Sequence, residues 1–194
     1  MSPEKQAAVA AAKTVDPSLV NTTPPHSYAP PAADEGPAAL VDQVKAAAVG
    51  LMGDYYSAGS MPSDMGERQT FITSGAGKAT RAAAIARVWT ADRVADEVAN
   101  LEKGMATFDG DASSVGMAKA VFVVTSWQKV TVDQNSASVA VTGLVHSMTH
   151  DGTAADDPTY QWQIDLVRSG PPNAYQGWRL HRVVHVELPE GVSQ

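Results

Sequence analysis

The amino-acid sequence predicts an α+β fold, in which helices from the first half of the chain pack on an antiparallel sheet from the last third. Apolar residues recur at helical spacing before residue 108, whereas a two-residue period dominates afterwards. The runs with this strand-like period cover 120–132, 136–148, 159–167 and 177–188. They are joined by short or turn-rich connections, which is typical of antiparallel neighbours.

Three helical stretches are expected. The first covers 38–56, and the next covers 78–89. Thr90 can cap a third helix that runs to about Thr107. We expect 57–66 to be a loop, while 67–73 is too short to classify. The core-facing residues of the first and third helices are Val44, Ala48, Leu51, Tyr55, Val94, Val98, Leu101 and Met105.

On the outer side of the third helix, Arg93, Asp96, Glu97 and Lys103 are expected to form a solvated face.

Alternation also assigns faces in the last two strands. Residues on the predicted apolar face are Tyr160, Trp162, Ile164, Leu166, Trp178, Leu180, Val184 and Val186. Gln161, Gln163 and Asp165 fall on the other face. His181 and His185 have the same polar parity in the next strand, so a cross-strand pair between Asp165 and a histidine is one interpretation, with proton transfer as its function. The other interpretation is that they are exposed polar residues with no catalytic role.

Composition excludes several classes of protein and site. The formal net charge is −7 and no cluster of Lys and Arg occurs, which argues against nucleic acid or an anionic membrane as the main partner. The chain has no cysteine, so disulfides and thiolate metal sites are excluded. We expect no metal and no cofactor. The pairs His146 and His150, and His181 and His185, would lie about 13 Å apart on a strand, too far to chelate one ion.

The chain divides into three parts by composition. Residues 1–37 are expected to be a flexible leader and linker rich in Ala and Pro, 38–188 the folded domain, and 189–194 a tail. Within the linker, 26–31 could instead dock on a partner as a polyproline segment. No run of apolar residues is long enough to span a membrane, and 1–13 is too weakly apolar for a signal peptide. A segment upstream of Met1 is left open.

Two short motifs do not meet the requirements of the sites they suggest. The segment Gly75-Ala-Gly77-Lys78 lacks the first glycine and the final Ser or Thr of a phosphate loop, so we expect a turn that opens a helix. Asp109, Asp111 and Ser113 have the spacing of a calcium loop, but Ala120 stands where the bidentate Glu belongs.

Catalytic residues, if the chain is an enzyme, are expected on the first helix. Asp54, Tyr55 and Tyr56 could reach the mouth of a curved sheet from there. Tyr55 also lies on the apolar stripe, which favours core packing. No elbow motif surrounds any serine, so nucleophilic catalysis has no candidate.

The order of elements, with a meander ending in Gly-Trp-Arg-Leu-His-Arg-Val-Val-His-Val at 177–186, resembles the nuclear transport factor 2-like superfamily. The resemblance covers about 38–188 and implies a cone-shaped sheet packed by helices. Within the superfamily, the segments 130–143, 160–168 and 177–180 look like the extracytoplasmic domain of actinobacterial conjugation or type IV secretion accessory proteins, or of proteins associated with mammalian-cell-entry transporters.

This resemblance implies a non-enzymatic assembly domain of an envelope-associated transport or conjugation machine. Its partners would be protein subunits of a membrane complex or further copies of the chain. The domain would lie outside the cell membrane if an anchor precedes Met1, and in the cytoplasm otherwise. The alternative is a small-ligand binder or an isomerase or cyclase of the same fold, with a pocket near Tyr55, Trp162 and Trp178. The expected apolar inner face carries no Asp or His, which argues against an enzyme.

Overall fold

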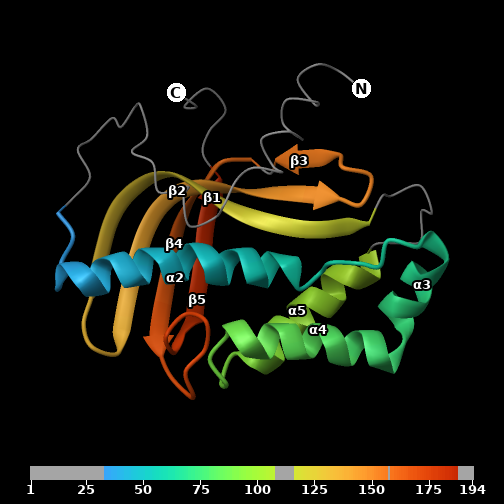
Figure 1. Cartoon of the computed structure of the whole chain (residues 1–194), viewed down its shortest axis with the longest axis horizontal. Coiled ribbons are helices and arrows are strands. Elements are labelled where there is room, and N and C mark those ends of the chain that lie inside the picture. Colours follow the sequence, from blue (N-terminus) through green and yellow to red (C-terminus); the bar gives the residue numbers. More distant parts are fainter. Residues whose placement is uncertain (1–32, 108–115, 157, 188–194) are drawn as a thin grey trace.

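The computed structural model describes residues 33–107, 116–156 and 158–187 and has an α+β architecture, as the sequence predicts. Helix α2 (Ala38–Ser57) lies across the sheet, while α3, α4 and α5 group beyond one end of it (Figure 1). Their bounds are Met65–Thr73 for α3, Gly75–Val88 for α4 and Val94–Thr107 for α5. The predicted helices 38–56 and 78–89 are therefore confirmed, and α3 is an addition.

The sheet is antiparallel, with the order β1-β2-β4-β5. Its strands are β1 (Met117–Val132), β2 (Ser136–Thr149), β4 (Tyr160–Arg168) and β5 (Trp178–Glu187). These match the four predicted runs. A short strand, β3 (Ala154–Asp156), pairs with the end of β2 inside a segment expected to be a loop. Long strands that are adjacent in the sheet thus also follow one another along the chain, as expected for antiparallel strands joined by short turns.

A β-bulge at His181 changes the faces of β5. Leu166 lies opposite Leu180, but Asp165 lies opposite Arg182, so His181 is the extra residue. Because one inserted residue reverses the alternation, Val183 and His185 share the face of Trp162, while Val184 and Val186 point away from it. The predicted apolar face of β5 was therefore wrong after Leu180.

The hydrophobic core lies between α2 and the inner face of the sheet. Val41, Val44, Ala48 and Leu51 of α2 are buried at helical spacing, and Ala47, Val49, Met52 and Gly53 are buried beside them. The large apolar side chains of this core with exposure of 3% or less are Leu51, Met52, Ile85, Trp89, Phe122, Trp162, Ile164, Leu166, Trp178 and Leu180. With Val139, Val141 and Val145 of β2, they join α2, α4 and all four long strands in one cluster.

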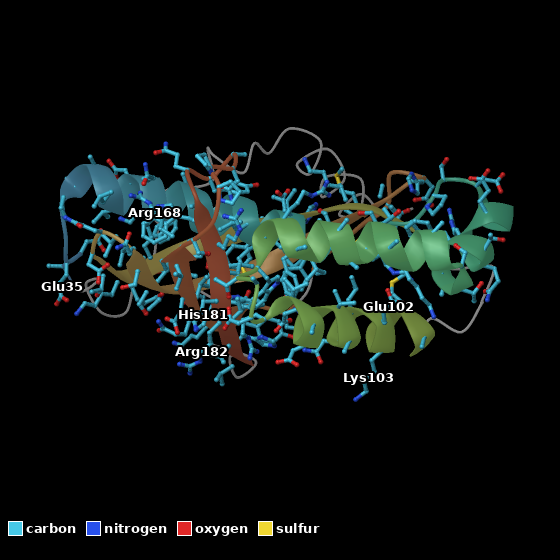
Figure 2. All side chains as sticks on the ribbon, turned by 90° about the horizontal axis from the view of Figure 1, so that it is seen from below. Glu35, Glu102, Lys103, Arg168, His181 and Arg182 are labelled. Atoms are coloured by element: carbon cyan, nitrogen blue, oxygen red, sulfur yellow. The ribbon has the colours of Figure 1, made fainter. Side chains whose placement is uncertain are left out.

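Arg81 holds the three shorter helices together. Its guanidinium is fully buried and forms two bonds to the carboxylate of Glu102 on α5, of 2.6 and 2.8 Å. It also donates to the carbonyl oxygens of Phe71 and Ile72 at the end of α3, each at 2.9 Å. Figure 2 shows Glu102 between α4 and α5, whereas Lys103 points away.

Ser74 caps α4 by accepting a bond from the amide of Gly77 at 3.1 Å. The segment that resembled a phosphate loop therefore opens a helix, as predicted.

Two expectations about α5 require correction. Thr90 does not cap this helix, which begins at Val94; the Thr90 amide instead donates to the carbonyl of Leu180 on β5 at 2.8 Å. Glu97 is not on a solvated face, because it is 6% exposed and faces the core. The residues of the rejected calcium loop, Asp109, Asp111 and Ser113, lie outside the described part of the chain, as do 1–32 of the predicted linker and the tail.

Candidate functional site

Consecutive residues near the end of α2 face different sides of the molecule. Successive positions of a helix are rotated by about 100°, and here Asp54 and Tyr55 contact groups on different sides of α2. Tyr55 and Tyr56 point toward the aromatic side chains of the sheet and of Trp89. Asp54 is exposed and faces the loop between β4 and β5. The three residues expected to act together thus divide between two regions.

The first region is an aromatic cluster at the end of the inner sheet face. The Tyr55 ring makes edge contacts with Trp89 and Tyr56, at centroid distances of 5.2 and 5.1 Å. Trp162 continues the cluster, and His185 stacks beside it at 4.6 Å. Edge-to-face contacts of this kind add to the stability of apolar packing.

Tyr55 carries the polar group of this cluster. Its hydroxyl donates to the Glu97 carboxylate at 3.0 Å, and Arg93 approaches the same carboxylate at 3.5 Å. Burial, with the nearby Glu97 charge and hydrogen bond, raises the pKa of Tyr55 above its ordinary value. A phenol with a raised pKa stays protonated at neutral pH, so Tyr55 acts here as a donor that satisfies a buried carboxylate.

Two groups lie where the sequence did not place them: His185 on the inner sheet face beside Trp162, and the buried Glu97 beside Tyr55. His185 reaches this face through the bulge at His181, and Glu97 comes from α5. The interpretation that pairs Asp165 with a histidine does not hold, since Asp165 lies opposite Arg182 and its carboxylate is 3.5 Å from that guanidinium.

The second region is a groove of about 400 Å³ on the other side of α2. Asp54 accepts a 2.6 Å hydrogen bond from the hydroxyl of Tyr175, in the loop between β4 and β5. Burial and this bond raise the pKa of Tyr175. Small residues of α2 and polar groups line the groove together. The lining residues are Gln43, Ala46, Ala47, Val49, Gly50, Gly53, Asp54, Ser57, Lys119, Ala120, Ala174, Tyr175 and Gln176.

Gly50 determines how closely the loop approaches α2 at this groove. A Cβ atom at position 50 would lie 2.3 Å from Cε1 of Tyr175, which is closer than two carbon atoms can approach. The ring therefore packs directly on the helix backbone, and no motif in the sequence predicts the contact.

The groove volume of about 400 Å³ is within the range of small-ligand sites.

Trp162 and Trp178, expected to line a pocket, are both almost fully buried. The indole of Trp162 donates to the carbonyl of Gly143 at 3.0 Å. The indole of Trp178 donates to Gln43 at 3.0 Å, and Arg168 lies over its ring at 4.7 Å from the centroid. Both indole N–H groups are thus satisfied within the protein, and neither residue is among those lining the groove.

Metal ligands do not gather in the described residues, where no group of three or more His, Cys, Asp or Glu side chains could hold an ion. His150 bonds to the Met61 carbonyl, and His181 contacts Thr90 and Asp92.

Within the described ranges, no helix has both the length and the apolar character that are needed to cross a bilayer.

Comparison with known proteins gives one structural similarity. No protein-family model matches the chain, and no curated protein matches its sequence. A crystal structure of an IcmL-like type IV secretion system protein from Legionella pneumophila is similar, with a TM-score of 0.48 and 12% sequence identity. The similarity covers 81% of this chain and 96% of that chain.

Proposed function

We propose that this chain is a non-enzymatic assembly domain of an envelope-associated transport or conjugation machine, related to type IV secretion systems, and that it acts by contacting protein subunits. One observation carries the proposal. The space between α2 and the sheet, where relatives with catalytic activity would hold a substrate, is occupied by the buried side chains of Trp162, Trp178, Phe122 and Leu51. The function is therefore sought on the surface.

The polar groups near this interior also favour a structural role. Tyr55 donates a hydrogen bond to Glu97, and the guanidinium of Arg93 lies beside the same carboxylate, so the charge of Glu97 is satisfied within the protein. An acid or base for catalysis needs access to a substrate as well as a suitable pKa. Glu97 is 6% exposed, which leaves it little contact with solvent.

The resemblance of 130–143, 160–168 and 177–180 to accessory domains of conjugation and secretion machines indicates the kind of assembly. On this proposal the domain lies in the cell envelope, attached through a segment that is not in the described residues. The superfamily assignment, nuclear transport factor 2-like, belongs to the same proposal.

Co-purification from the native host tests this function. The full chain with a small affinity tag would be expressed at its native level, the membranes crosslinked and solubilised, and the captured proteins quantified by mass spectrometry. We expect enrichment of several subunits of one membrane transport complex over an untagged strain. Recovery of the chain without any such subunit would contradict the proposal.

A second candidate function is small-ligand binding in the groove beside Asp54. The volume of about 400 Å³ and the pairing of Asp54 with Tyr175 at its rim favour it. Ligand screening by thermal shift would test this candidate, with Asp54→Asn as the matched variant. A compound that stabilises the native chain but not the variant would support ligand binding, whereas stabilisation of both would place the compound elsewhere.

A further inference from the structure

Most of the sheet's two outer edges is covered or distorted within the described chain. On β1, the Met117 carbonyl accepts from the Met61 amide at 2.9 Å, and Ser57 bonds both backbone groups of Ala120 at 3.0 and 3.1 Å. Glu35 bonds to Val130 and Val132, each at 2.8 Å. Register shifts interrupt β1 at three further places. Covers and bulges of this kind prevent a foreign strand from pairing with a sheet edge.

The second half of β5 is different. Its edge is covered at Leu180, whose carbonyl accepts from Thr90. From Arg182 to Glu187 the backbone pairs with β4 on one side, and the described chain supplies no backbone or side-chain bond on the other. The bulge at His181 lies just before this stretch, and no register shift follows it. Because the backbone groups of a strand point alternately to its two sides, every second residue of this stretch presents open hydrogen-bonding groups within the described chain.

Apolar side chains accompany this open edge. Val184 is 42% exposed and Val186 is 69% exposed, and they are the two large hydrophobic residues classed as exposed in the described chain. Both point to the outer sheet face because of the bulge. Exposed apolar residues on an unpaired strand are a recognised site of strand addition.

The charge of β5 indicates what would bind. The chain carries a net charge of −7, yet β5 holds Arg179, Arg182, His181 and His185 against one acid, Glu187. Arg182 is 61% exposed, and its contact with Asp165 is long at 3.5 Å. Figure 2 shows His181 and Arg182 together on this strand. A second copy of the chain would bring two such basic strips together, whereas an acidic segment would be attracted.

We propose that β5 between Arg182 and Glu187 binds an extended acidic segment of a partner protein, which joins the sheet as an additional strand. This inference rests on the proposed function in protein assembly. The partner's backbone would bond to the open edge. Its apolar side chains would cover Val184 and Val186, and its carboxylates would lie near Arg182 and His185. Backbone bonding provides the affinity in such complexes, and the side-chain pattern provides the specificity.

Peptide binding to the isotope-labelled full chain tests this inference. The probe is a ten-residue peptide with the central segment Val-Glu-Val-Val-Glu, which in antiparallel pairing sets valines opposite Val186, Val184 and Val183 and glutamates opposite His185 and Arg182; one control has lysine at every glutamate position, and another has proline at its centre. We expect the acidic peptide to bind at least about tenfold more tightly than either control, with an affinity that falls as salt screens the charges. Its amide shift changes should concentrate at 182–187.

Two variants locate the site. Arg182→Glu should weaken binding of the acidic peptide about tenfold or more. Val186→Glu, which leaves the contact between Arg182 and Asp165 intact, should weaken it to a similar degree. Arg87→Glu, at an exposed position on α4, is the control of equal charge change and should bind as the native chain does. Equal binding of the acidic and lysine peptides, absence of binding, or shift changes at the Asp54 groove would each overturn the inference. A dimer that dissociates in Arg182→Glu would also overturn it, in favour of a second copy.

Crosslinking in host cells separates this inference from the proposed function. A photoreactive residue at position 186 should capture an envelope subunit, whereas one at the exposed Ala99 of α5 should not. If machine subunits co-purify but position 186 captures none of them, the docking edge is wrong and the assembly function stands. If nothing co-purifies and the acidic peptide still binds at 182–187, the assembly function is wrong and the edge stands.

Discussion

Replacing Gly77 by alanine should destabilise the protein, although helix propensity alone predicts the opposite. A Cβ atom at position 77 would lie 1.8 Å from the carbonyl oxygen of Phe71, on the backbone of α3. Real Cβ contacts are essentially never shorter than 3.0 Å, so the Phe71 carbonyl would have to move by more than an ångström. That carbonyl also accepts a bond from the buried Arg81, which the movement would break.

The size of the effect follows from these contacts. Overpacking costs about 1–3 kcal/mol, and a lost hydrogen bond to a charged group costs about 1.5–3 kcal/mol. The gain from replacing glycine in a helix offsets up to about 1 kcal/mol. We therefore expect Gly77→Ala to lower the free energy of unfolding by roughly 1.5–5 kcal/mol, measured by urea denaturation with tryptophan fluorescence as the signal.

Gly104→Ala is the matched control, because Gly104 lies inside α5 and an added Cβ would meet nothing within 4 Å. Here only propensity acts, so the free energy of unfolding should rise by about 0.5–1 kcal/mol. A Gly77→Ala protein as stable as the native chain would refute the described contact between α3 and α4. Loss of stability in both variants would instead show that helix propensity had been misjudged.

Two further predictions concern titrating groups. Hydrogen bonds from Arg81 hold the pKa of Glu102 below its usual value near 4.5. The pair should therefore stabilise the fold above that pH and lose its effect as pH falls through the lowered pKa. Glu102→Gln should lower the free energy of unfolding by about 1–3 kcal/mol at pH 7 and lose less further stability in acid than the native chain, whereas parallel pH profiles of urea denaturation would contradict this. In Gly50→Ala the ring of Tyr175 must move away from α2 and lose its bond to Asp54. Burial and that bond raise the pKa of Tyr175, so the pKa should fall in an NMR titration of labelled tyrosines. An unchanged pKa would show that the ring does not pack on Gly50.

The elements of this fold could be predicted because each has a simple period. The four long strands follow alternating runs, and α2 follows an apolar stripe that is buried at Val44, Ala48 and Leu51. The start of α4 was predicted from the turn at Gly75-Ala-Gly77-Lys78, and the structure shows that Ser74 caps it. Local sequence was sufficient in these places because the burial of one face and the bonds of one cap decide the structure.

Contacts between distant segments could not be predicted in the same way. The bulge at His181 exchanges the faces of Val184 and Val186, yet a single inserted residue leaves the local composition of a strand unchanged. Glu97 appeared suited to a solvated face because its helical neighbours are charged, but the hydroxyl of Tyr55 bonds to it in the interior. The site residues divided for a similar reason, since only the fold shows that Asp54 faces a loop.

The most direct test of the account is hydrogen–deuterium exchange of the full chain, compared between its free form and the complex isolated from host membranes. The account predicts that binding slows exchange chiefly at the amides of Arg182 to Glu187, because a partner strand would satisfy the open edge of β5. Protection of Asp54 and Tyr175 with no change at this edge would contradict it and would favour the groove as the functional site.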